Sequence, residues 1–103
     1  VPIKTVRRAL NEILLITPPR LDQVVRTVMD AVVERHGFRK YTSYVAKVGR
    51  AYFVEIYVVT PPDFQVGGIA TLDAIRQEIS TAISDQRSYQ WLIVEFTADE
   101  RWI

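Results

Sequence analysis

Residues 41–62 read YTSYVAKVGRAYFVEIYVVTPP, and this stretch decides the fold of the chain. It contains two runs rich in Tyr, Thr, Val, Phe and Ile, at 41–48 and 51–60, and this composition is typical of β-strands. The Gly49-Arg50 pair between the runs places glycine at the first central position of a two-residue hairpin turn. Pro61-Pro62 ends the second run, because consecutive prolines cannot donate ladder hydrogen bonds. The stretch therefore predicts a β-hairpin.

Amphipathic helices are predicted on both sides of this hairpin. In residues 21–36 apolar side chains recur at spacings of three and four, and Gly37 fits the position that follows a helix. Residues 72–83 repeat the apolar pattern, and a shorter helix is predicted at 3–16. The apolar run at 90–97 predicts a last strand.

The predicted elements follow the order α-β-β-α-β after an N-terminal helix. A strand that is joined through a helix to a parallel strand of the same sheet makes a right-handed crossover, which places the helix at 72–83 on one face. The helix at 21–36 must also bury its apolar side, so we expect it to share that face. The order therefore predicts an α+β fold. We expect a ferredoxin-like two-layer sandwich that lacks the first strand and has a small mixed three-stranded sheet.

The composition limits the classes of function. The chain of 103 residues has room for one domain, and its 13 Lys and Arg against 12 Asp and Glu leave a net charge of +1. This balance lacks the strongly basic character of phosphate-backbone binding, so no nucleic acid is expected as a partner. The absence of cysteine excludes disulfides, thiolate metal sites and cysteine nucleophiles. The longest aliphatic run, at 13–16, is far shorter than the roughly 20 residues of a membrane span.

Both faces of the predicted sheet are largely apolar. A sheet with water on one face should alternate cleanly between apolar and polar residues, and these strands do not. We therefore expect the second face to form the interface of a symmetric homodimer, through Phe53, Tyr57, Trp91 and Ile93. The alternative is that residues 1–16 fold back over this face.

The sequence contains no arrangement of residues that is typical of catalysis. His36 is the only histidine and the serines lie in no nucleophile motif, so no catalytic residues and no enzyme activity are expected. His36 precedes Gly37 at a predicted helix end, where a cation is stabilised, and this interpretation is favoured over a ligand role. Glu95 is predicted to share a strand face with Glu55, and Asp99 lies in the tail. His36, Glu95 and Asp99 are the candidate ligands of a zinc-like divalent cation, although strand-edge exposure of the glutamates and a solvated surface are the simpler interpretation.

Four strings of the sequence carry a family resemblance. They are the segment 8–19, the hairpin string at 48–59, LDAIRQEI at 72–79 and WLIVEFTAD at 91–99. Together they resemble the cytoplasmic C-terminal domain of the cation diffusion facilitator, or cation efflux, transporters, over most of residues 8–103.

This resemblance implies a ferredoxin-like domain attached to a membrane-embedded exporter of divalent metal ions that is driven by proton exchange. In that family the cytoplasmic domain dimerises and, in several members, binds metal that tightens the dimer. Many members carry histidines at positions where this sequence has Tyr41, Tyr57 and Glu95. The histidine-rich metal site is therefore not carried over.

The resemblance also implies a division of the chain and a location. Residues 1–19 are expected to form a helix and linker from a preceding membrane span, and residues 20–103 a cytoplasmic domain. Lys4, Arg7 and Arg8 fit the basic bias beside a membrane span, or a solvated helix face.

The expected function is regulation and dimerisation of a divalent cation exporter at the cytoplasmic side of the cell membrane. Its expected partners are a second copy, its own transmembrane domain and zinc-like ions. The alternatives are a free-standing ferredoxin-like module that binds a small ligand and a small dimeric oxygenase or isomerase.

Overall fold

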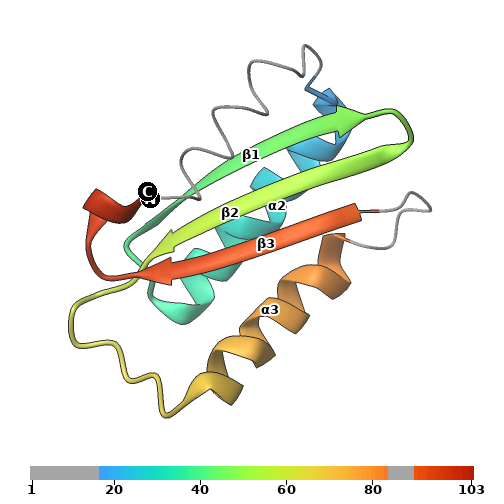
Figure 1. The fold of residues 1–103 in the computed structure, drawn as a ribbon. Helices are drawn as coiled ribbons and strands as arrows, with labels where there is room; N and C mark the ends of the chain where they lie inside the picture. The colour runs from blue at the N-terminus through green and yellow to red at the C-terminus, as the bar shows by residue number, and fades with distance from the viewer. Residues whose placement is uncertain (1–16, 84–89) are drawn as a thin grey trace.

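The computed structural model describes residues 17–83 and 90–103 (Figure 1). Its elements are α2 (Pro19–His36), β1 (Lys40–Val48), β2 (Ala51–Val59), α3 (Ile69–Ile83), β3 (Gln90–Thr97) and the short 3₁₀ helix η1 (Glu100–Trp102). The predicted order α-β-β-α-β is confirmed. The predicted helix at 3–16 lies outside the described residues. Among the helices that the structure describes, none has the length and apolar character needed to cross a bilayer.

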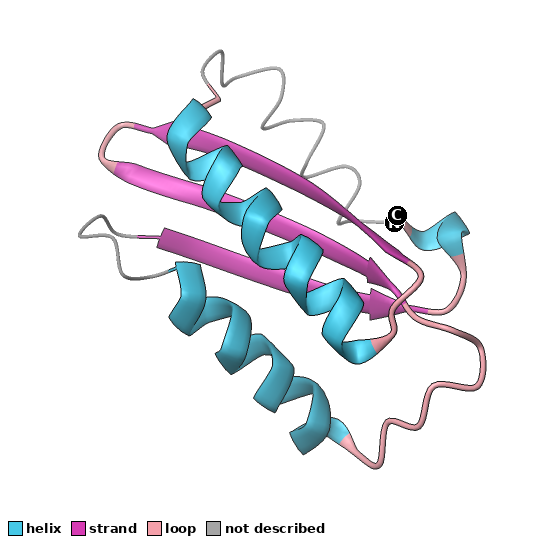
Figure 2. Cartoon of the chain, turned by 180° about the vertical axis from the view of Figure 1, so that it is seen from behind, coloured by secondary structure: helices cyan, strands magenta, loops and turns pink. Residues whose placement is uncertain are grey.

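The three strands form one mixed sheet in the order β1-β2-β3. β1 and β2 pair antiparallel through the hairpin, whereas β2 and β3 pair parallel. Parallel neighbours need a crossover connection, and α3 lies in that connection. Figure 2 shows α2 and α3 together on one side of the sheet. The predicted ferredoxin-like α+β sandwich with a small mixed sheet is therefore confirmed.

Local signals in the sequence explain where the elements end. Gly37 follows α2 with φ 72°, a left-handed conformation that glycine adopts without strain, and its N–H group donates to the carbonyl of Val33. Gly49 in the hairpin turn has φ 57°, while no residue other than glycine has a positive φ among those described. This pattern fits a turn with glycine at its first central position. α3 begins at Ile69, three residues before the predicted start of its apolar pattern at Leu72.

The hydrophobic core lies between the helices and one face of the sheet. It combines side chains from all five main elements: Leu21, Val25, Met29 and Val32 of α2, Val45 of β1, Val54, Ile56 and Val58 of β2, Ile75, Ile79 and Ile83 of α3, and Val94 of β3. Burying one such aliphatic side chain stabilises a fold by roughly 1.5–3 kcal/mol. The core therefore holds both helices against one face of the sheet. The opposite face has no helix of the described chain packed on it.

Candidate functional site

We call the sheet face that points away from α2 and α3 the second face. The first face is the one that packs against the helices. Successive residues of β2 alternate between the two faces, so the core residues Val54, Ile56 and Val58 and their register partners lie on the first face. Phe53, Glu55 and Tyr57 lie on the second face. The strand register arranges the second face in three rows: Ala46-Phe53-Trp91, Tyr44-Glu55-Ile93 and Thr42-Tyr57-Glu95.

The structure brings the four predicted interface residues together on this face. Phe53 and Trp91 are register partners, and their rings stack with centroids 5.9 Å apart and an interplanar angle of 10°. Trp91 is 52% exposed and Ile93 is 43% exposed, although each lies in a strand of the sheet. Tyr57, by contrast, is only 3% exposed. The accessible part of the predicted interface therefore consists of Trp91, Ile93 and the half-buried Phe53.

A buried polar pair lies beside these apolar side chains. The hydroxyl of Tyr57 donates a hydrogen bond of 2.7 Å to Oε2 of Glu55, which is 6% exposed. The ring of Tyr44 meets that of Tyr57 edge-on, with centroids 6.1 Å apart. The predicted strand-edge exposure of Glu55 is wrong, because β2 is the central strand and has a neighbour on each side. Glu95, on the edge strand β3, is half-buried.

His36 ends α2, as predicted, and its ring nitrogen Nε2 lies 2.9 Å from Oε1 of Glu78 on α3. Nη1 of Arg35 lies 2.7 Å from Oε2 of the same glutamate, an electrostatic contact without hydrogen-bond geometry. The His36 ring also stacks on Phe38, with centroids 5.4 Å apart. The carboxylate of Glu78 therefore joins the two helices.

The other two candidate metal ligands lie in different surroundings. Asp99 accepts hydrogen bonds from the backbone N–H of Arg101 at 3.0 Å and from its Nε at 2.8 Å. The backbone bond is the main reason that the pKa of Asp99 lies below its ordinary value. Glu95 lies on the second face as the register partner of Tyr57. Within residues 17–83 and 90–103, no three His, Asp or Glu residues gather closely enough to hold a metal ion.

The tyrosines that the family resemblance singled out do not share one face. Tyr41 is the register partner of the core residue Val58, and its hydroxyl donates to Oδ1 of Asp30 at 3.0 Å. Burial is the main cause that raises the pKa of Tyr41, and the bond to Asp30 adds to it. The residue that joins Tyr57 and Glu95 in a row is Thr42.

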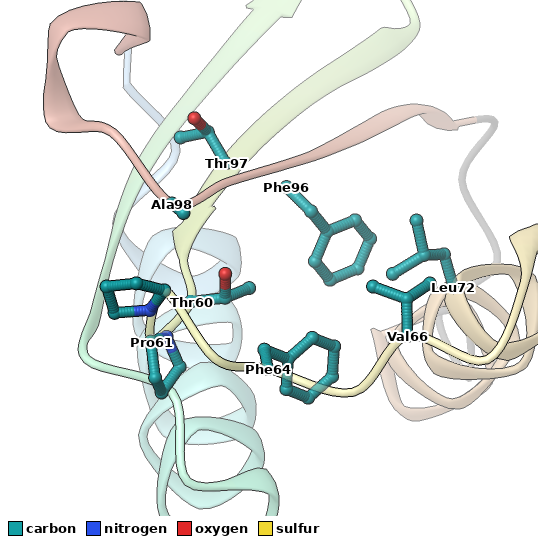
Figure 3. Close-up of a pocket in the computed structure, with 9 residues that line it drawn as sticks. Thr60, Pro61, Phe64, Val66, Leu72, Phe96, Thr97 and Ala98 are labelled. Atoms are coloured by element: carbon teal, nitrogen blue, oxygen red, sulfur yellow. The ribbon is translucent and has the colours of Figure 1, made fainter.

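Sequence reasoning did not predict a groove at the end of the sheet where β2 and β3 finish. The groove has a volume of about 270 Å³, and Figure 3 shows side chains from three separate segments around it. Its lining residues are Thr60, Pro61, Pro62, Phe64, Val66, Leu72, Phe96, Thr97 and Ala98. The only sequence signal was the presence of two large apolar residues, Phe64 and Val66, in a segment predicted as a loop, 63–68.

Comparison with known proteins shows which solved domains have a similar fold. No protein-family model and no curated protein matches the sequence. Among solved structures, the chain is similar to the C-terminal domain of the magnetosome protein MamB from Desulfamplus magnetovallimortis, with 16% identity and a TM-score of 0.58 over 75% of this chain and 95% of that one. It is also similar to a zinc form of a MamM C-terminal domain variant, with 16% identity and a TM-score of 0.54 over 82% and 91% of the two chains.

A third solved structure, the metal-bound C-terminal domain of the CzcD transporter from Thermotoga maritima, has 23% identity and a TM-score of 0.47 over 78% of this chain and 93% of that one. The likeness to the MamB and MamM domains confirms, at the level of the fold, the resemblance found in the sequence.

Proposed function

We propose that the chain is the cytoplasmic regulatory and dimerisation domain of a divalent cation efflux transporter, and that it has no enzymatic activity of its own. Two separate lines support this proposal. The four sequence strings resemble the cytoplasmic domains of that family, and the fold is shared with the C-terminal domains of MamB and MamM. Export of the ion, its coupling to protons and its selection belong to a membrane part.

The observation that carries the dimerisation proposal is the exposure of large apolar side chains on the second face. Trp91 and Ile93 present much of their surface there, beside the stacked ring of Phe53. Exposed apolar side chains that lie together in a small domain are typical of an interaction site. A two-fold axis through this face would bury Trp91 and Ile93 of both copies, since a symmetric interface uses the same patch twice.

The dimerisation proposal is tested by light scattering on the chain at high micromolar concentration, where we expect a dimer. Trp91→Glu should shift the chain to a monomer, because a carboxylate buried at the interface would lose its water without a partner. Trp102→Glu is the matched control: Trp102 is also 52% exposed but lies in η1 after the sheet. It should leave the dimer unchanged.

The same experiment can overturn the proposal. A wild-type monomer at these concentrations would contradict it, and so would equal weakening by both tryptophan variants. If circular dichroism shows that Trp91→Glu unfolds the chain, Ile93→Lys takes its place, with Ile69→Lys as control, because Ile69 is 76% exposed at the start of α3. Association that survives Ile93→Lys would exclude the second face.

The transporter proposal also has a genetic test. The coding sequence that precedes the codon for Val1 should encode several hydrophobic spans, each of roughly 20 residues. A start codon directly before Val1 would contradict the transporter proposal and favour a free-standing module.

A further inference from the structure

One part of the second face is enclosed, although no helix that the structure describes packs on it (Figure 2). Tyr57 is 3% exposed and Val59 is fully buried, yet neither belongs to the core cluster beneath α2 and α3. Glu55 is also buried on this face. Trp91 and Ile93 of β3, by contrast, are exposed. The burial is therefore uneven: it encloses the side chains of β2 and leaves the β3 side of the face open.

The neighbouring strands account for only part of this burial. Side chains of a strand stand roughly perpendicular to the sheet, so those of β1 and β3 shield the flanks of a β2 side chain rather than its tip. The hydroxyl of Tyr57 bonds to Glu55, so this side chain lies along β2 beside the carboxylate. The ring of Tyr44 meets Tyr57 edge-on from β1 and shields one side of it. The outer surface of the Tyr57 ring needs a further layer.

The sequence that precedes α2 has the pattern of such a layer. The described chain starts at Thr17, and residues 1–16 come before it. Apolar side chains recur there at spacings of three and four, which predicts a helix with one apolar side. The side chains of this apolar side are those of Ile3, Val6, Leu10, Ile13 and Leu14. A helix of this kind must bury its apolar side against another element.

This segment joins the described chain beside β1, which is an edge strand. The chain reverses direction in the short loop 37–39 between α2 and β1, so α2 begins near the hairpin end of β1 (Figure 1). A helix over residues 3–16 is roughly 20 Å long, and β1, with nine residues, is roughly 30 Å long. From Thr17 the segment can therefore pass around the edge of the sheet and run along β1 on the second face.

The charges of the segment and of the second face are complementary. The face carries the carboxylates of Glu55 and Glu95. Residues 1–16 contain one acidic residue, Glu12, and three basic residues, Lys4, Arg7 and Arg8. In the predicted helix Arg7 lies one turn from Leu10, at the border of the apolar side, where its cation can approach a carboxylate of the face.

We propose that residues 1–16 bind across β1 and β2 on the second face as an amphipathic helix, with the apolar side against Tyr44 and Tyr57. The β3 side of the face, with Trp91 and Ile93, stays open to a second copy. The segment and the second copy then occupy different parts of one face. The contact lies within one chain and does not depend on the transporter or the dimerisation proposal.

A nitroxide spin label tests this contact, and the absence of native cysteine allows a single attachment site. The label is attached through Asn11→Cys, off the apolar side of the predicted helix, and NMR records the broadening of backbone amide signals. The amides of Tyr44 and Glu55 should lose most of their intensity. The amide of Gln77 should retain it, because α3 lies in the helix layer on the other side of the sheet (Figure 2). The same sample with the nitroxide reduced gives the reference intensities.

Two substitutions that each add one carboxylate test whether the apolar side makes the contact. Leu10→Asp lies on the apolar side and should restore the intensity of Tyr44 and Glu55 in the labelled chain. Thr5→Asp lies on the polar side and should leave the broadening unchanged. In Trp91→Glu the broadening should persist even when the chain is monomeric, so failure of this proposal is distinguishable from failure of the dimerisation proposal.

Three outcomes would overturn the proposal. The first is equal broadening of Tyr44 and Gln77, and the second is broadening that survives Leu10→Asp. The third comes from a mixture, in the Trp91→Glu background, of a spin-labelled chain without ¹⁵N and a ¹⁵N chain without label. Broadening of Tyr44 in this mixture as strong as in the directly labelled chain would show that a second copy supplies the segment. The comparison of Tyr44 with Gln77 keeps the test decisive if circular dichroism shows that Leu10→Asp unfolds the chain.

Discussion

Glu55 is the most enclosed acidic side chain of the sheet, and its surroundings explain how an apolar face accepts it. Taking a carboxylate out of water is costly unless donors replace the lost water. The hydroxyl of Tyr57, two residues along β2, replaces part of it with a bond of 2.7 Å. Since successive residues of a strand alternate between faces, residues i and i+2 lie on the same face, which lets the pair form within one strand.

Removing the hydroxyl of Tyr57 should therefore destabilise the fold. We expect Tyr57→Phe to lower the free energy of unfolding by about 1–3 kcal/mol, because the buried Glu55 loses a donor while the ring remains. Glu55→Gln keeps an oxygen that accepts from Tyr57 and should cost less. Urea denaturation followed by circular dichroism measures both changes.

Tyr52→Phe is the control for that substitution. Tyr52 packs against the core from the other face of the same strand, and its hydroxyl makes no hydrogen bond with any residue the structure describes. Its loss should change the free energy of unfolding by less than about 0.5 kcal/mol. Equal effects of the two substitutions would mean that the bond between Tyr57 and Glu55 contributes nothing specific.

At the scale of elements, the 3₁₀ helix η1 is held to the start of β1 by charged groups. Glu100 forms ion pairs with Lys40 and with Arg39, and Asp99 caps η1 through the N–H of Arg101. The hydrogen bond from Lys40 is the main cause that lowers the pKa of Glu100. The tail carboxylates therefore fix η1 beside the start of β1.

These contacts should weaken in acid. A carboxyl whose pKa is lowered in the folded chain stabilises it above the unfolded pKa, and this contribution is lost as the pH falls through the folded pKa. We expect the amide signal of Arg101 to titrate with a midpoint below 3.8, the ordinary value for Asp99. NMR spectra recorded from neutral pH to about pH 2 measure it.

The variant Asp99→Asn serves as the control, because an amide has no proton to lose in this range. In this variant the amide signal of Arg101 should no longer shift with the protonation of a carboxyl at position 99. A wild-type midpoint at or above 3.8 would show that the N–H of Arg101 does not hold the carboxylate in solution.

Element type was predictable from the sequence because its signals are local. The glycine at position 49, the prolines after β2 and the spacing of apolar residues in α2 each act within a few residues of the chain. The surroundings of Glu55 and Glu78 depend on β3 and on α2, which are distant in sequence. The groove joins three segments that only the crossover through α3 brings together. Long-range packing therefore decided the features that the sequence did not predict.

At the scale of the whole molecule, the candidate metal ligands are separated by the fold. His36 contacts Glu78 at the end of α2, Asp99 is bound by Arg101 after β3, and Glu95 lies on the second face. A tight zinc site needs several imidazole or thiolate ligands with matched geometry. The chain has one histidine and no cysteine. Binding of zinc within one chain should therefore be weak.

Isothermal titration calorimetry with a zinc salt tests this expectation. We expect no submicromolar binding, and the same weak heats in His36→Ala as in the wild type, because one imidazole beside the cation of Arg35 attracts a metal ion poorly. A dimer could reverse this result, since it would bring Glu95 of two chains toward a shared interface on the second face. Submicromolar zinc binding could disappear in both Glu95→Gln and the Trp91→Glu variant that we expect to be monomeric, and this result would place a metal site between the copies. If submicromolar binding is lost only in His36→Ala, the metal site lies at the end of α2. Either outcome would contradict the weak-binding prediction and assign ion sensing to this domain.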